Sequence, residues 1–188
     1  MMKKTSFLLL GAAFLVSSLA FVAPKNPKAP LTLAVQSDKS RVDFIGSKAA
    51  DFHTGTFTVK GGSVQVEGGK LVGGSFVIDL ANLKVTDAAG ERLAGHLKSA
   101  DFFDVAKFGE ATYTISSVDY SSATACTING TLNVKGVGVP VSFASNIRSA
   151  SEKGFFGQAY FSIDRTLLGI AYAGPSKDVQ IAVHLFAK

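Results

Sequence analysis

Short runs of alternating apolar and polar residues follow one another along most of the chain. From Thr54 to Lys60, Phe57 and Val59 fall on one side, whereas the threonines and Lys60 fall on the other. A period of two places successive side chains on opposite faces, so each run predicts a half-buried β-strand. The apolar positions of the other runs are Val64 and Val66; Phe76, Ile78 and Leu80; Tyr113 and Ile115; Ile128, Leu132 and Val134; Val139, Val141, Phe143 and Ile147; Phe155, Ala159, Phe161 and Ile163; and Val179, Ile181, Val183 and Leu185.

Eight or nine such runs occur with almost no helical pattern between them. Strands that follow one another without crossover helices pair antiparallel. An open sheet of this size would expose two hydrogen-bonding edges, so the pattern predicts an all-β fold closed into an up-and-down barrel. The apolar face then points inward, which suits an apolar ligand. Small barrels can also fill their interiors with side chains, so the period alone leaves a filled structural barrel open.

Breaks in the alternation mark places where strands turn or bend. The pairs Gly61–Gly62, Gly68–Gly69 and Gly73–Gly74 indicate turns, bulges or close approaches of two backbones. A slip of phase at Ser116–Ser117 predicts a β-bulge, and the stretch 136–140 predicts the turn before the next strand.

One segment, from Asp87 to Lys98, lacks the strand pattern. Asp87 is a suitable helix cap, and Leu93 and Leu97 lie one helical turn apart. We therefore expect a short helix or helical loop near one end of the barrel. It either covers a barrel mouth or is an ordinary surface connection.

Residues 1–20 have the features of a signal peptide. Lys3 and Lys4 precede an uncharged apolar run from Phe7 to Ala23, and 18–20 offer the small-x-small pattern that signal peptidases cleave. Cleavage near Ala20 would release the protein to the periplasm or the exterior. An uncleaved membrane anchor is the alternative, although the run is short for a span of roughly 20 apolar residues.

The mature chain is expected to contain a tether and one domain. Residues 21–31 are rich in proline and lysine and predict an extended tether. Residues 32–188 are enough for one domain with a continuous core, and no feature indicates the oligomeric state.

Charge and cysteine content narrow the function further. The formal net charge is +5, and loss of residues 1–20 removes two lysines and no acidic residue, which lowers it to +3. Such a weak, scattered charge argues against nucleic-acid binding and indicates a solvated surface that at most loosely favours anionic membranes. Cys126 is the only cysteine, so no disulfide forms within the chain, and its phase matches Ile128, which predicts a buried, inert thiol.

Four segments resemble, in order and spacing, signatures of the YceI-like family of secreted lipid-binding proteins. His96 to Phe108 reads HLKSADFFDVAKF, similar to the family's HLxSxDFFDxxxF. The other three matches are Gly46, Lys48, His53 and Gly55 to GxK…HxG, Gly130–Val141 to GxLxxxGxxxPV, and Phe161–Ile170 to FxIDRxxxGI. The resemblance covers about Thr32 to Ala187, and it departs from the family at Phe44, often Trp, and at Gly109, commonly Pro.

This resemblance implies a single eight-stranded antiparallel lipocalin-like barrel that is exported and holds an isoprenoid lipid, of the prenyl quinone or prenyl pyrophosphate type. The implied function is non-catalytic binding, storage or transport, with the lipid as ligand and no cofactor. A prenyl tail needs only a dry apolar tunnel, in which each buried carbon group contributes roughly 0.8 kcal/mol. Fifteen Phe and no Trp suit such a lining, because Phe buries area without an N–H that needs a partner.

The candidate lining residues are aromatic and lie on the inward phase or beside the helical segment. Each could equally be plain core. They are Phe44, Phe57, Phe76, Phe102, Phe103, Tyr113, Phe143 and Phe161.

Three polar residues are candidates for contact with a lipid head group. His53 and His96 could hydrogen-bond a quinone carbonyl, and Arg165 could attract a phosphate. The alternative is structural: the histidines would satisfy or anchor nearby loops, and Asp164 with Arg165 would lock the turn after their strand.

An enzyme acting on a bound lipid through His53, His96 and Asp101 is the other functional class. The sequence offers it little support, since it contains neither a GxSxG nor a phosphate-binding loop. A metal site is not expected, because HExxH is absent and His184 lies on the opposite phase from Val183 and Leu185.

Overall fold

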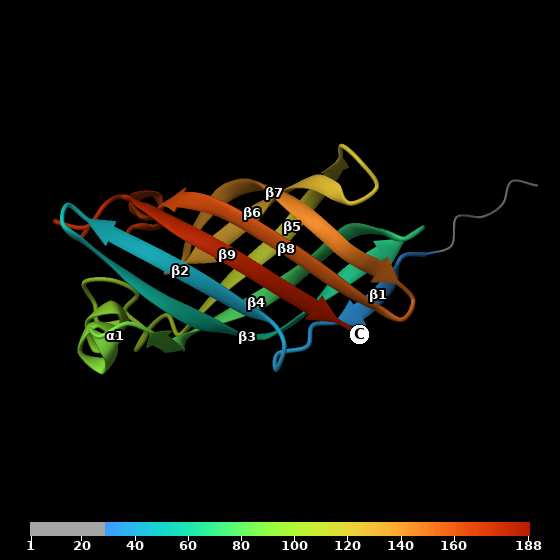
Figure 1. Cartoon of the computed structure of the whole chain (residues 1–188). Coiled ribbons are helices and arrows are strands. Elements are labelled where there is room, and N and C mark those ends of the chain that lie inside the picture. The colour runs from blue at the N-terminus through green and yellow to red at the C-terminus, as the bar shows by residue number, and fades with distance from the viewer. Residues whose placement is uncertain (1–28) are drawn as a thin grey trace, which may run out of the picture.

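The computed structural model describes residues 29–188, so the predicted signal peptide and most of the predicted tether lie outside the described residues. Nine strands and two short helices make up this part of the chain (Figure 1). The strands are β1 (Leu31–Ala34), β2 (Arg41–Lys48), β3 (Asp51–Glu67), β4 (Lys70–Val85), β5 (Glu110–Tyr120), β6 (Ala125–Val134), β7 (Val137–Ser151), β8 (Gly154–Asp164) and β9 (Asp178–Ala187), and the helices are α1 (Gly90–Lys98) and the 3₁₀ helix η1 (Arg165–Leu168).

Strands β2 to β9 form a closed barrel. Hydrogen-bonded neighbours follow the order β3-β2-β9-β8-β7-β6-β5-β4, and β4 pairs with β3 to complete the circle. All of these pairings are antiparallel, so the predicted eight-stranded antiparallel barrel is confirmed. Strand β1 stands outside the circle and pairs with the far part of β3.

Strands β3 and β4 run unbroken past two of the three glycine pairs. Gly62 and Gly74 have φ values of +135° and +144°, a region that side chains rarely adopt. A Cβ at Gly62 would lie 2.2 Å from the Ser75 carbonyl oxygen, and one at Gly74 would lie 2.5 Å from that of Ser63. These glycines therefore permit a close approach of two backbones, whereas 68–69 form the turn between the strands.

The other predicted irregularities are confirmed in one place and corrected in another. The register between β5 and β6 shifts between Ile115 and Ser117, where a bulge was predicted. The turn predicted over 136–140 is too long, because β7 already begins at Val137 and Pro140 pairs with Thr131 of β6. The proline is tolerated since the pairing of β7 with β8 begins only at Ser145, so no ladder bond to β8 is lost there.

A short helix is present where one was predicted, but Asp87 does not cap it. The N-cap is Ala89, without a side-chain hydrogen bond. Asp87 instead accepts hydrogen bonds from the main-chain N–H groups of Thr54 (2.7 Å) and Ala89 (2.8 Å), because it lies beside the start of β3. It therefore ties the connection before α1 to the β2–β3 hairpin, while α1 packs on β4.

The elements divide the barrel into two ends. The β2–β3 hairpin, α1 and η1 lie toward one end, at the left in Figure 1, and β1 and the C-terminus lie toward the other. At the β1 end the interior is packed solid: Val59, Val64 and Leu71 are at most 2% exposed, and Leu33 of β1 is buried against them. Cys126 is also buried, as predicted, and burial raises the pKa of its thiol.

Candidate functional site

The end that carries α1 and η1 contains a cavity of about 220 Å³. An apolar cavity of roughly 150 Å³ is enough to bind benzene, so this one has room for part of a hydrocarbon chain. Inward residues of the barrel strands form its walls. Residues of α1, of the segment after α1 and of the loop 169–177 cover it at the end of the barrel. The alternation of the strands therefore produces a cavity at one end and a solid core at the other.

The structure places all eight predicted aromatic residues in the cavity lining. They are Phe44, Phe57, Phe76, Phe102, Phe103, Tyr113, Phe143 and Phe161. Sequence reasoning missed the aliphatic part of the lining, although Leu132, Ile163 and Ile181 share the inward phase that could have identified them. Pro175 and Ser176 of the loop also line the cavity, and no pattern in the sequence marks them.

Four aromatic rings form the floor of the cavity. Phe76 lies 5.7 Å from Tyr113, Tyr113 lies 5.4 Å from Phe143, and Phe143 stacks on Phe161 at 4.4 Å, all measured between ring centroids. The Tyr113 hydroxyl donates a hydrogen bond of 3.0 Å to the Val141 carbonyl oxygen. Burial raises the pKa of Tyr113 to about 12, so the phenol stays neutral and the floor carries no charge.

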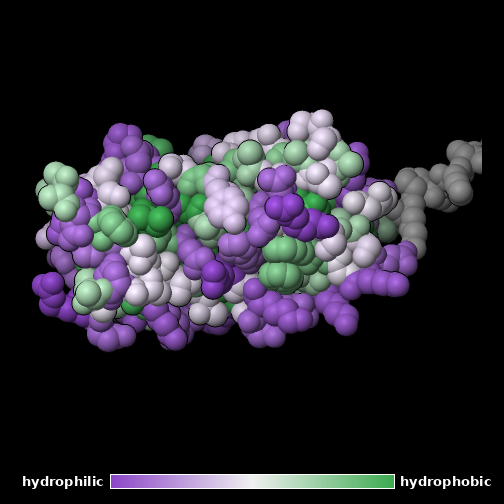
Figure 2. All heavy atoms as spheres, in the orientation of Figure 1, coloured by the Kyte–Doolittle hydropathy of each residue, from purple (hydrophilic) through white to green (hydrophobic). Residues whose placement is uncertain are grey.

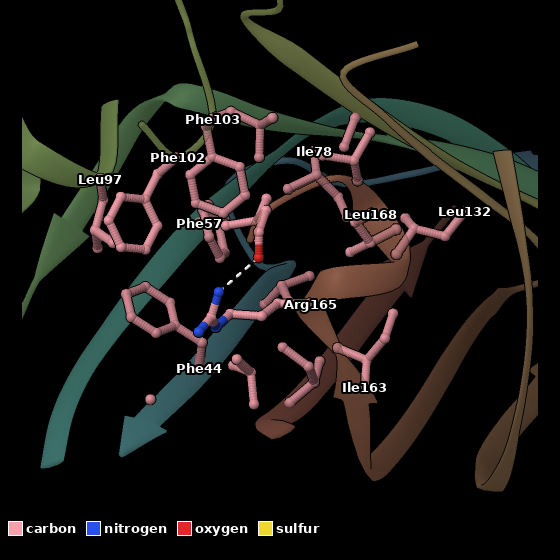
Figure 3. A pocket seen from close by; sticks show the side chains of 18 of the residues that line it. Phe44, Phe57, Ile78, Leu97, Phe102, Phe103, Leu132, Ile163, Arg165 and Leu168 are labelled. Carbon is pink, nitrogen blue, oxygen red and sulfur yellow. Dashed lines mark hydrogen bonds between the residues drawn. The ribbon is translucent and has the colours of Figure 1, made fainter. Parts of the chain in front are cut away.

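A second aromatic cluster lies beside α1. Phe103 packs edge-on against Phe57 at 5.6 Å, and Phe102 lies 4.9 Å from Tyr172 of the loop 169–177. Lys135 fixes this segment through a 2.6 Å hydrogen bond to the Phe102 carbonyl oxygen. Figure 3 shows the Phe57, Phe102 and Phe103 rings on the α1 side of the cavity, with the Arg165 side chain nearby.

Arg165 lines the cavity and is only 8% exposed. Its guanidinium donates hydrogen bonds to the carbonyl oxygens of four residues of one loop: Ile170, Tyr172, Pro175 and Ser176. Asp164 caps η1 by accepting from the Thr166 N–H at 2.9 Å. Asp164 and Arg165 therefore hold the turn after β8 in place, as the structural alternative expected. The Arg165 charge nevertheless lies beside the cavity.

His53 and His96 occupy different environments. His53 lines the cavity, and its Nδ1 lies 3.3 Å from Asp87 Oδ2. Main-chain N–H groups of Ala89 and Thr54, and to a lesser extent His53, hold the pKa of Asp87 below its ordinary value.

His96 lies outside the cavity lining. Its ring packs edge-on against Phe102 at 5.1 Å and Tyr172 at 5.0 Å, and its Nε2 lies 3.6 Å from Asp101. His96 is a covering residue of the aromatic cluster, and Asp101 pairs with it rather than with His53.

No group of three or more His, Cys, Asp or Glu residues among 29–188 could hold a metal ion. His184 points away from the interior and contacts Gln158 at 3.1 Å. Within the same residues, no helix is long and apolar enough to cross a membrane.

Comparisons with known proteins agree with this geometry. The YceI-like domain family matches residues 33–187. A UPF0312 protein of Pseudomonas putida is 28% identical over 170 residues, which cover 89% of this chain and 85% of the relative.

Several solved structures share the fold. Burkholderia cenocepacia BcnA superimposes with a TM-score of 0.70 at 19% identity, over 82% of this chain and 99% of that one. A polyisoprenoid binding domain from Saccharophagus degradans, implicated in plant cell wall breakdown, gives 0.66 at 17% identity, over 83% and 97%. The Campylobacter jejuni YCEI protein gives 0.57 at 13% identity, over 98% and 99%.

Proposed function

Because the chain belongs to the YceI-like domain family, we propose that it binds an isoprenoid lipid in the barrel cavity and stores or carries it without chemical turnover. The observation that carries this proposal is the cavity, whose lining is apolar apart from a few groups at its rim. Each tail carbon buried there contributes roughly 0.8 kcal/mol, so affinity needs no specific motif. A related fold is described as a polyisoprenoid binding domain, which supports the ligand class. The proposed function needs the lipid as ligand and no cofactor.

The head group is proposed to lie beside Arg165 and His53. The Arg165 guanidinium has five N–H groups, and four of them donate to loop carbonyl oxygens. One N–H, on Nη1, is left for a ligand. One donor suits a single quinone carbonyl, whereas a pyrophosphate is best held by a forked pair of donors. The proposal therefore favours a prenyl quinone over a prenyl pyrophosphate.

The absence of turnover rests on how the polar residues are arranged. His53 pairs with Asp87, and His96 pairs with Asp101 outside the lining. General acid–base catalysis needs its groups within hydrogen-bond reach of the reacting atoms, and only His53 of the three candidate catalytic residues faces the cavity. We propose a binding protein on this ground.

The proposed compartment is the periplasm or the exterior, supported by the signal-peptide pattern of residues 1–20. Membranes there would supply the lipid, and the cavity end has side chains suited to a transient contact. Phe52, Leu167 and Tyr172 are 60%, 58% and 40% exposed around the mouth. Two lysines at this end are paired with carboxylates, Lys177 with Asp164 at 3.2 Å and Lys48 with Asp51 at 3.5 Å, so the contact is proposed to be apolar rather than electrostatic. Figure 2 shows green and purple side chains mixed at this end.

The test is native mass spectrometry of the full protein purified from its own host without detergent. The proposal predicts a bound species with the mass of a prenyl quinone. Phe143→Asp should abolish retention because it places a charge in the floor, whereas Tyr160→Asp, on the 65% exposed outer face, should retain the lipid. A folded protein that carries no prenyl lipid, and binds none when it is added, would overturn the proposal, and a prenyl pyrophosphate would overturn the quinone assignment.

A further inference from the structure

The cavity ends at a layer of side chains to which all eight barrel strands contribute. The deepest lining residues on the eight strands are Val42, Phe57, Phe76, Tyr113, Leu132, Phe143, Phe161 and Val183. The next inward residues along three of these strands, Val59, Ser145 and Ala159, are buried and lie outside the lining. A ligand tail that enters beside α1 therefore meets a floor.

Phe143 is the central side chain of that floor. It contacts Tyr113 on one side and Phe161 on the other, and it is 8% exposed. The stacked pair Phe143 and Phe161 is nearly parallel, with 6° between the ring planes. Tyr113 cannot swing aside without losing its hydrogen bond to Val141, so the rings support one another in place.

The next inward residue along β7 below Phe143, and the two residues that pair with it, are small. Ser145 follows Phe143 along β7 and pairs with Ala159 of β8 on one side and with Cys126 of β6 on the other. Truncation of the Phe143 ring would therefore extend the cavity downward over Ser145, Ala159 and Cys126, while Ile128 of β6, which pairs directly with Phe143 and is buried, would bound the new space on its side. Phe143 is thus the floor residue whose removal opens the largest path toward small side chains.

We infer that Phe143, supported by Tyr113 and Phe161, sets the maximum length of tail that this protein buries, so that affinity rises with tail length only up to that limit. This inference rests on the proposed lipid-binding function. Scaling from benzene in roughly 150 Å³, the cavity of about 220 Å³ holds on the order of ten carbon atoms. The part of a longer tail that does not fit between the mouth and the floor stays outside the cavity and gains no affinity.

The test measures dissociation constants of the full chain for a series of unbranched and prenyl alcohols of increasing length. For the unaltered protein, affinity should rise about fourfold per buried methylene and then stop rising at a limiting length. Phe143→Ala should move this limit to longer tails, and Leu132→Phe, which adds bulk to the same layer, should move it to shorter ones. Phe103→Ala removes an equal ring near α1, so it should weaken binding at every length and leave the limit unchanged.

The possible outcomes separate this inference from the proposed function. Binding of no alcohol by the unaltered protein would contradict lipid binding itself. Binding with no limiting length, or a limit that stays the same in folded Phe143→Ala protein, would overturn the role of Phe143 alone. If Phe143→Ala does not fold, Phe143→Leu keeps most of the packing and should shift the limit by a smaller amount.

Discussion

The two halves of the barrel interior are built from the same alternation of residues but are packed differently. On β3, Phe57 lines the cavity, while Val59, the next inward residue, is completely buried in solid core. The difference arises from the elements that close the two ends of the barrel. Strand β1 adds Leu33 to the far end, whereas α1 and the loop 169–177 cover the near end without filling it. A barrel can thus be stabilised by one half and bind a ligand with the other.

The largest expected effect comes from the same substitution made in each half. Leu71→Ala, at a position 2% exposed in the solid half, should lower the free energy of unfolding by about 3 to 5 kcal/mol, because it leaves a cavity among close-packed side chains. Leu132→Ala, in the cavity wall, should cost about 1 kcal/mol, since its side chain already lacks neighbours on one side. Urea unfolding monitored by circular dichroism measures both values. Equal losses would mean that the two halves are equally packed.

An intermediate loss of stability is expected on substitution of Arg165, whose hydrogen bonds hold the loop 169–177 at the cavity mouth. Arg165→Met removes four hydrogen bonds to loop carbonyls, so stability should fall by about 2 to 4 kcal/mol. Affinity for a prenyl quinone should fall as well, because the loop that lines the cavity loses its anchor. Arg148→Met is a matched control, since Arg148 lies on the exposed surface and bonds Gln158, and it should change stability by at most about 0.5 kcal/mol. Similar losses in the two variants would contradict the anchoring role.

The smallest expected effect is a pH dependence at Asp87. Its folded-state pKa is lowered from 3.8 mainly by the N–H groups of Ala89 and Thr54. A lowered pKa stabilises the folded protein above the unfolded-state pKa, and this stabilisation is lost as the pH falls through the folded value. The melting temperature of Asp87→Asn should therefore lie below that of the unaltered protein at neutral pH, and the gap should narrow below pH 3.8. A gap that is constant with pH would show that the Asp87 charge contributes nothing.

How much the sequence predicts also differs between the two halves. Alternation is a local property, so it correctly predicted β4 to β9, the bulge near Ser116 and the inward direction of Phe57 and Phe143. It divided the continuous β3 into two runs and marked neither β1 nor β2. It could not say which half is open, because Phe57 and Val59 follow the same pattern. That outcome depends on the stagger of the barrel and on what covers its ends.

The positions of residues in the loops at the cavity mouth could not be predicted from the sequence either, because they depend on tertiary contacts. Asp87 was predicted to cap α1, but its position beside the start of β3 gives it tertiary partners that outweigh its local preference. His96 was a head-group candidate, yet the packing of its ring against Tyr172 keeps it outside the lining. Neither Tyr172 nor Pro175 belongs to a periodic segment, so their positions follow from the Arg165 hydrogen bonds and not from any pattern.

A crystal structure determined under xenon pressure would show whether the α1 half of the barrel holds a dry apolar cavity, because xenon enters such cavities and is visible there by its electron density. We expect xenon, or the tail of a co-purified lipid, on the α1 side of the Phe143 ring, and no such density around Val64. Ordered water throughout the α1 half of the interior, or side chains that fill this half completely, would contradict a lipid-binding cavity.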